Sequence, residues 1–167
     1  MTRESLQSHD ILLFAVATLL ACTANYFPID FFTGSQLILG NVIAVAVTLL
    51  LGARYGIACC LISGLVTWFN WQHLYVLLPF AGEIAVIAYA RGRQKSAFLF
   101  GIRYWFTAGW IVVAIQYFSF SDYFVITKFA ITVKYIVNGI VNVMFGYVLA
   151  YLLRPYIKSS WRESLHF

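Results

Sequence analysis

The sequence has few charged residues. Only 10% of its 167 side chains are Asp, Glu, Lys or Arg, whereas 62% are hydrophobic. About a quarter of the residues of a soluble globular domain are charged, because its surface has to be covered with groups that water solvates. The shortage therefore excludes a soluble globule and predicts an integral membrane protein.

Cysteine and histidine are equally scarce, and their positions argue against a metal or haem site. The three cysteines, Cys22, Cys59 and Cys60, all fall inside apolar runs, where a thiol behaves as a small hydrophobic group. His73 has no second histidine near it in the predicted topology. We therefore expect no disulfide, no metal and no cofactor.

Motifs for catalysis and for nucleic-acid binding are also missing. The sequence contains no nucleophile motif, no glycine-rich phosphate loop and no spaced pair of carboxylates. It has no basic stripe of the kind that tracks a phosphate backbone. We expect no catalytic residue, so the chain as given is not predicted to be an enzyme, and we expect no nucleic-acid partner.

Apolar segments, by contrast, are abundant in the sequence. Six of them are bounded by polar or turn-forming residues, and they cover residues 11–27, 36–51, 57–69, 74–89, 97–118 and 123–153. They predict an all-α, polytopic membrane helix bundle with six transmembrane helices. Several are shorter than the roughly 20 residues of a straight span, so we expect a thin region with Trp68, Trp71 and Tyr75 at the interface.

The basic residues predict the orientation of this bundle. Arg54 and the Arg91 to Lys95 turn fall between the second and third and between the fourth and fifth segments, whereas the three other loops contain no Lys or Arg. Since Lys and Arg in short loops favour the cytoplasmic side, both termini are predicted to be cytoplasmic. The same rule places the loops around Asp30, His73 and Asp122 on the outer side.

The chain divides by composition into two parts. Residues 1–153 form the predicted transmembrane domain, and residues 154–167 form a basic, amphipathic cytoplasmic segment. Two interpretations of this segment stay open. It is either a helix on the membrane surface or a connector that ends where a cytoplasmic output domain would begin.

Glu83 is the residue that most needs an explanation, because it is an acid well inside an apolar segment. Ionisable groups at membrane depth usually face a bundle interior or a wet cavity, together with a partner. Lys134 lies at a similar predicted depth in the last segment, on one helix face with Asn138 and Asn142. We therefore expect a buried Glu83–Lys134 ion pair, which is either structural or linked to a ligand or a proton.

The polar residues of the fourth and sixth segments predict a ligand site. A small molecule would enter from the periplasmic side, in an apolar pocket with a few convergent polar groups. The expected ligand-binding residues are Trp68, Trp71, His73, Glu83, Lys134, Asn138 and Asn142. His73 is either a ligand contact or pH-sensitive switch, or an ordinary interfacial residue. The alternative for the whole set is that its members satisfy one another in a closed bundle.

Residues 27 to 104 resemble a known class of membrane sensor. The resemblance is carried by FPIDFFTGSQLILGN, by LLLGARYGIACCLISGLVTWFNWQHLY, by Glu83 in the next helix and by the RGRQK turn. It is similar to the MASE-like multi-span N-terminal sensor modules of bacterial diguanylate cyclases and sensor histidine kinases, in which Trp71, His73 and Glu83 match recurring positions. The resemblance implies a homodimeric receptor in the bacterial inner membrane whose last helix runs into a signalling linker.

These observations leave two classes of function. The first is a membrane-embedded sensory or ligand-binding domain that passes a signal through its last helix to a cytoplasmic output domain such as a diguanylate cyclase or a histidine kinase. The second is a small transport or assembly subunit, similar in span count to the S components of vitamin transporters or to the MreD-type rod-shape subunit.

Gly139 and Gly146, one heptad apart, fit close helix approach either within the bundle or across a dimer.

Overall fold

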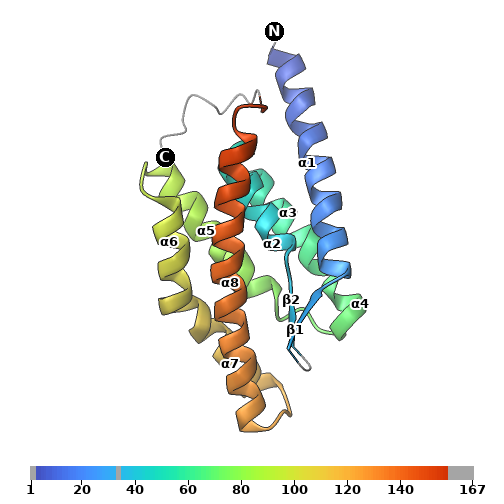
Figure 1. Ribbon diagram of the computed structural model, residues 1–167, viewed down its shortest axis with the longest axis vertical. Helices are drawn as coiled ribbons and strands as arrows, with labels where there is room; N and C mark the ends of the chain where they lie inside the picture. Colours follow the sequence, from blue (N-terminus) through green and yellow to red (C-terminus); the bar gives the residue numbers. More distant parts are fainter. Residues whose placement is uncertain (1–2, 33–34, 158–167) are drawn as a thin grey trace.

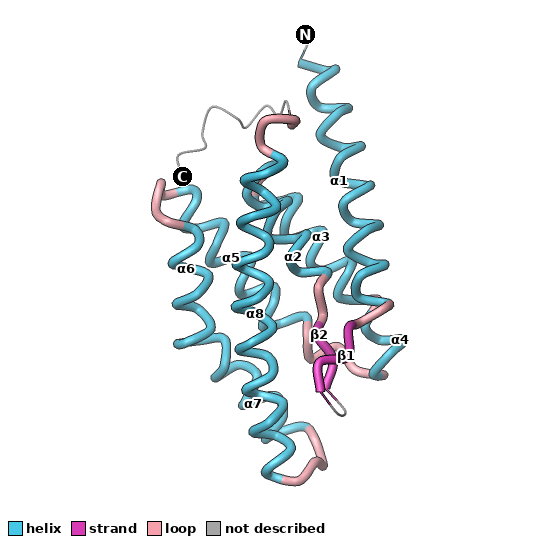
Figure 2. The backbone as a smooth tube through the Cα atoms, in the orientation of Figure 1, coloured by secondary structure: helices cyan, strands magenta, loops and turns pink. Residues whose placement is uncertain are grey.

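A computed structural model describes residues 3–32 and 35–157 of the chain, and the side chains of residues 8–30 and 36–157. Within these ranges the protein is a helical bundle with one short hairpin (Figures 1 and 2). In chain order the elements are α1 (Arg3–Tyr26), β1 (Ile29–Phe32), β2 (Ser35–Leu37), α2 (Gly40–Leu51), α3 (Ala53–Leu65), α4 (Thr67–Trp71), α5 (Leu77–Gly92), α6 (Ala97–Tyr104), the π-helix η1 (Trp105–Gly109), α7 (Trp110–Phe120) and α8 (Val125–Leu153).

Among the described residues, three helical stretches are long and apolar enough to cross a membrane. They are Ser8–Tyr26, Ala97–Phe120, which joins α6, η1 and α7, and Val125–Leu153. Large apolar side chains on their outer faces are exposed, among them Leu19 at 68% and Phe145 at 61%. Such faces need a lipid environment, so the expectation of a membrane protein is confirmed, while six spans stay a prediction.

Helix α2 lies at the centre of the bundle. It packs against α1, α3, α5 and α8, and every residue from Ala44 to Leu51 is buried. At about 1.5 Å per residue its length is about 18 Å, well short of a bilayer core of about 30 Å. The helix is therefore apolar because protein surrounds it, and it supplies the core against which the longer helices pack.

Close helix contacts in this core use glycine. A Cβ atom added at Gly146 of α8 would lie 2.6 Å from Val45 Cβ and 2.7 Å from the Val42 carbonyl oxygen, both on α2. No side chain larger than glycine fits such an approach without moving backbone. Gly146 therefore serves packing within the bundle, which is one of the two roles that its sequence spacing left open.

The ends of the bundle are distinct. The start of α1, the end of α8 and the turns α2–α3 and α5–α6 lie at one end, at the top of Figure 1. The hairpin, α4 and the α7–α8 loop lie at the other end. This grouping matches the partition of Lys and Arg in the sequence, and the positive-inside rule makes the first end the predicted cytoplasmic one.

The hairpin was not expected from the sequence, which was interpreted as all-α. Strands β1 and β2 pair antiparallel, with Asp30 opposite Gln36, and Gln36 Nε2 donates a hydrogen bond to Asp30 Oδ1 at 3.0 Å. Pro28 and Gly34 indicate a break in helical structure, but they do not distinguish a hairpin from an irregular loop. Of the predicted cytoplasmic segment 154–167, residues 158–167 lie outside the described residues.

Candidate functional site

Glu83 is fully buried in the centre of the bundle, on α5. Its Oε1 accepts a hydrogen bond from Trp105 Nε1 of η1 at 2.7 Å, and its Oε2 accepts one from Asn41 Nδ2 of α2. A buried carboxyl group needs hydrogen-bond donors, since its desolvation is costly without them. We call Asn41, Glu83 and Trp105 the acid cluster; it joins three separate elements through one side chain.

The π-helix η1 places Trp105 in this cluster. Helix α6 ends at Tyr104 and α7 begins at Trp110, and the five intervening residues form a wider turn. Single π-turns inside α-helices are frequent at functional sites. The Trp105 side chain is fully buried, and its ring packs on Gly139 so closely that an added Cβ there would overlap the ring. Gly139 therefore makes the space in α8 that Trp105 fills.

Lys134 has different neighbours from Glu83. Its Nζ lies 5.8 Å from the ring centroid of Trp71 and 5.1 Å from that of Tyr135, whereas the carboxyl group of Glu83 contacts α2 and η1. The predicted Glu83–Lys134 ion pair is therefore wrong. The sequence matched the two residues by depth counted from predicted helix ends. In the structure Trp105, the partner of Glu83, packs on Gly139 of α8, more than one turn beyond Lys134, so the two residues differ in level as well as in direction.

Around Lys134 the predicted outer end of the bundle is rich in aromatic rings. His73 stacks on Tyr75 at 4.6 Å between ring centroids, and it meets the edge of Tyr117 at 6.2 Å. Tyr75 donates a hydrogen bond to the Phe120 carbonyl oxygen at 2.9 Å and so ties the loop before α5 to the end of α7. We call the set of Trp71, His73, Tyr75, Tyr117, Lys134 and Tyr135 the outer cluster.

A row of aromatic contacts connects the outer cluster to the acid cluster. Tyr117 and Tyr135 lie 5.9 Å apart by ring centroids, with their hydroxyl oxygens 3.4 Å apart. Phe80 of α5 stacks on Tyr135 at 5.9 Å and meets Trp105 edge-on at 5.5 Å. Ring pairs at such distances are in direct contact. Lys134 is thus connected to Trp105, a hydrogen-bond partner of Glu83, by direct contacts through Tyr135 and Phe80.

The burial of His73 affects its protonation. Burial lowers the pKa of the His73 imidazole below its usual value of 6.5, and the nearby positive charge of Lys134 lowers it further. His73 is therefore neutral at pH 7. At this pH Lys134 supplies the positive charge of the outer cluster.

The two asparagines of α8 are in contrasting situations. Asn138 Oδ1 accepts from the Ile38 backbone N–H at 2.8 Å, and its Nδ2 donates to the Ile38 carbonyl oxygen at 3.0 Å, so it clamps the segment that leads into α2. Asn142, one turn later, is fully buried, and neither amide atom has a hydrogen-bond partner among the described residues. Roles for both in ligand binding stay predictions.

The structure brings some predicted site residues together and separates others. Trp71, His73 and Lys134 share the outer cluster, while Glu83 belongs to the acid cluster. Trp68 on α4 is 46% exposed, and no ring contact joins it to the outer cluster among the described residues. Of the residues expected in one pocket, Trp71, His73 and Lys134 lie in the outer cluster and Glu83 lies in the acid cluster. Trp68, Asn138 and Asn142 belong to neither cluster.

Tyr75 was expected at the membrane interface but not in the site, and four further participants were missed by the sequence analysis: Asn41, Trp105, Tyr117 and Tyr135. Three of them are aromatic residues in apolar helices, where the sequence offers no feature that separates a site residue from an ordinary core residue. Asn41 did offer a signal. It is a polar residue at the start of an otherwise apolar helix, and such residues need a partner when buried.

No group of three or more His, Cys, Asp or Glu that could hold a metal ion occurs among the residues that the structure describes. No protein family, no curated protein and no solved structure matches the chain.

Proposed function

We propose that the chain is a membrane-embedded sensory domain that binds a small carboxylate-bearing ligand from the outer side at Lys134. Binding shifts the position of α8, and α8 carries the signal towards the cytoplasmic end. The class of function is the one that the sequence resemblance implies, but the proposed site is the outer cluster and does not include the expected Glu83–Lys134 ion pair.

The observation that carries the proposal is the environment of Lys134. Its ammonium group is flanked by the rings of Trp71 and Tyr135, and Glu83, the acid predicted to neutralise it, is engaged with Asn41 and Trp105. A half-buried cation is stabilised by an anion that comes to it. A carboxylate supplies that charge, and an apolar or aromatic body on the same ligand suits the surrounding rings.

Helix α8 is suited to passing on the binding event. It is the longest described element, with 29 residues, and it packs against α2, α6, η1 and α7. Lys134 lies near its outer end, Gly139 contacts Trp105 in its middle, and Gly146 contacts α2 further along. A ligand shifts such an equilibrium only by its difference in affinity for the two arrangements, and a contact on α8 itself provides that difference.

Titration of the purified protein in nanodiscs tests the binding step. The probes are benzoate and succinate, with benzamide as the uncharged control, and the readout is the thermal unfolding temperature. We expect a saturable rise with at least one carboxylate and none with benzamide. The rise should disappear in Lys134→Met and persist in Lys128→Met, a matched control on the same helix whose Nζ lies 5.6 Å from the ring of Phe118.

Equal responses of the Lys134→Met and Lys128→Met variants would contradict the assignment of Lys134, because both remove one positive charge from α8. An equal response to benzamide would show that the ring and not the carboxylate is recognised. Either result would show that the ligand is not held by an interaction between its carboxylate and Lys134.

A small transport or assembly subunit is the second candidate. The observation that favours it is a pair of apolar grooves beside α2, of about 440 and 260 Å³, to both of which α1, α2 and α8 contribute lining residues. A partner helix would fill such grooves. Purification in mild detergent distinguishes the two candidates, since an assembly subunit retains a stoichiometric membrane protein of a different sequence, whereas a sensory domain needs at most a second copy of itself.

A further inference from the structure

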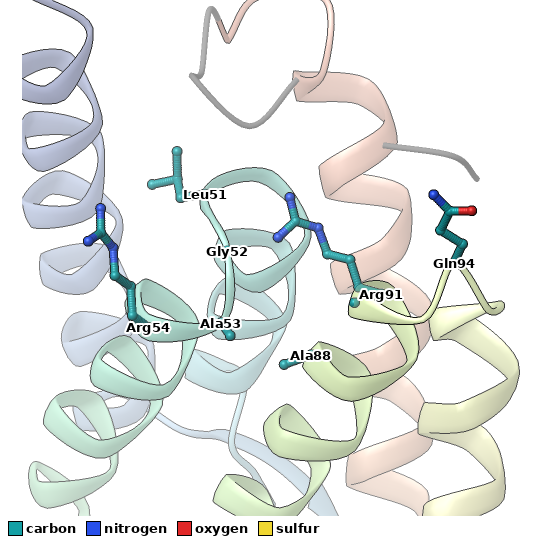
Figure 3. Close-up of a pocket in the computed structure, with 8 residues that line it drawn as sticks. Leu51, Gly52, Ala53, Arg54, Ala88, Arg91 and Gln94 are labelled. Atoms are coloured by element: carbon teal, nitrogen blue, oxygen red, sulfur yellow. The ribbon is translucent and has the colours of Figure 1, made fainter. Parts of the chain in front are cut away.

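We infer that a pocket at the predicted cytoplasmic end binds a phosphate-bearing anion, independently of the outer cluster. The pocket has a volume of about 510 Å³ and lies between the α2–α3 turn and the end of α5. Figure 3 shows its lining: Leu51, Gly52, Ala53, Arg54, Ala88, Arg91, Gly92 and Gln94. Two of these residues are cationic and none is acidic.

Arg91 is the main reason to expect a ligand. Its Nε and Nη2 atoms are buried, and neither has a hydrogen-bond partner among the described residues. Guanidinium donors that are withdrawn from water and left unpaired are costly. The Arg91 side chain as a whole is only half-buried and lines the pocket. A rotation of the guanidinium towards the pocket would present its planar fork to a phosphate, which accepts two parallel hydrogen bonds from one Arg.

Arg54 adds a second positive charge on the opposite wall. Its guanidinium carbon lies 4.7 Å from the centroid of the Tyr55 ring, and its Nη2 donates to the Tyr55 hydroxyl at 3.2 Å. Tyr55 is in turn packed on Phe14 of α1, with 5.3 Å between ring centroids. In Figure 3 the side chains of Arg54 and Arg91 extend in the same general direction from opposite sides of the Gly52 turn.

The start of α3 contributes backbone donors beside these two residues. Gly52 has a φ angle of 107°, which favours glycine, and α3 begins immediately after it without a side-chain cap. The first N–H groups of an α-helix have no partner inside the helix, and they favour an anion at that end. Ala53 lines the pocket, so these donors lie at its edge.

Small residues keep the space open. Gly52, Ala53, Ala88 and Gly92 make up half of the lining, and an added Cβ at Gly92 would have no atom within 4 Å. Basic pockets between helices on the cytoplasmic side of a membrane bind the head groups of anionic lipids. The same donors bind free phosphate, so the shared chemistry is a phosphate group and the experiment has to separate its two sources.

The test is thermal unfolding of the protein in nanodiscs of stated composition. In one arm inorganic phosphate is titrated, at constant ionic strength, into nanodiscs of phosphatidylcholine alone. In the other arm the fraction of phosphatidylglycerol in the nanodisc is raised without free phosphate. We expect a saturable rise in the unfolding temperature. A rise in the first arm identifies a soluble phosphate ligand, and a rise only in the second identifies a lipid head group.

Arg91→Gln is the decisive variant, and Arg93→Gln is its matched control. Arg93 is on the same turn but outside the pocket lining, with its guanidinium 5.5 Å from the ring of Tyr89. We expect the half-saturating anion concentration to rise at least about tenfold in Arg91→Gln and to change less than about twofold in Arg93→Gln. Arg54→Gln, at an exposed position, takes the place of Arg91→Gln if that variant does not fold.

Two results would overturn the inference. One is an unfolding temperature that responds in neither arm. The other is an equal weakening in Arg91→Gln and Arg93→Gln, which would reduce the effect to general attraction between a basic surface and anions. Neither result bears on the outer cluster, whose probes and variants are different.

Discussion

At the scale of single residues, burial alone does not show what a polar side chain does. Asn138 and Asn142 lie on the same face of α8, and both are almost completely inaccessible to water. Asn138 uses its whole amide to pair with the Ile38 backbone, whereas the amide of Asn142 has no partner within the described ranges. Asn138 therefore holds the Ile38 segment in place. The amide of Asn142 can instead bind a bridging water or acquire a partner when the bundle rearranges.

This contrast predicts opposite effects for the same substitution. Asn138→Leu leaves a backbone N–H and a backbone carbonyl unpaired in the core, so it should lower the free energy of unfolding by about 2 to 4 kcal/mol. Asn142→Leu removes an unpaired amide and should be neutral or stabilising. Chemical denaturation in detergent micelles measures both. A loss for Asn142→Leu equal to that for Asn138→Leu would mean that Asn142 has a partner in solution.

His73 predicts a pH dependence of stability. Because its folded-state pKa is lowered, chiefly by burial, the unfolded chain binds a proton more readily than the folded one. The stability linked to this group is therefore fully present above about pH 6.5, and it is lost as the pH falls through 6.5 towards the lower folded-state value.

Denaturation midpoints measured between pH 5 and pH 8 should show this loss in the natural protein, and His73→Gln should flatten it over the same range. An unchanged pH profile in that variant would assign the effect to another group. Within the described ranges the charge that acts on His73 is that of Lys134.

At the scale of elements, the acid cluster ties α2, α5 and η1 together, while Lys134 belongs to a different set of contacts. Double-mutant cycles should show this difference. Glu83→Met and Trp105→Phe each leave one partner of a 2.7 Å hydrogen bond unpaired, so their effects on unfolding should be coupled by about 0.5 to 3 kcal/mol. Glu83→Met and Lys134→Met should add within about 0.5 kcal/mol.

The unfolding free energies of the single and double variants in the two cycles show whether Glu83 interacts with Trp105 or with Lys134. A coupled Glu83–Lys134 cycle together with an additive Glu83–Trp105 cycle would restore the ion pair that the sequence suggested and contradict the observed arrangement. Since each cycle uses the same Glu83 substitution, they differ only in the partner tested.

The elements that sequence could predict are those marked by long apolar runs. Each of the six predicted segments overlaps an observed helix. The reason is that backbone N–H and C=O groups that cannot reach water form hydrogen bonds with one another inside the segment. The interruption at Trp105 was not predictable, since a π-turn leaves no change in hydrophobicity. The neighbours of Glu83 were also not predictable, because a depth counted from predicted helix ends fixes neither the level of a side chain in the bundle nor the direction in which it points.

At the scale of the whole molecule, a sensory domain that binds its ligand outside and signals inside requires the two ends of the bundle to face opposite sides of the membrane. The α5–α6 turn with Ser96 lies at one end and the α7–α8 loop with Ser121 at the other. With Cys22, Cys59 and Cys60 replaced by Ala, we expect Ser121→Cys to react with an impermeant maleimide added to spheroplasts. Ser96→Cys should react only after permeabilisation. Labelling of Ser96→Cys from outside would show that the orientation is opposite to the predicted one.

The central claim is that a carboxylate at Lys134 moves α8 relative to the rest of the bundle. The most direct test is the distance between spin labels at Tyr89 of α5 and Leu152 of α8, both exposed, in nanodiscs with and without a saturating carboxylate probe. We predict a shifted distance distribution in the natural background and an unchanged one in Lys134→Met. A distribution that the probe leaves unchanged in both, or shifts equally in both, would contradict the account.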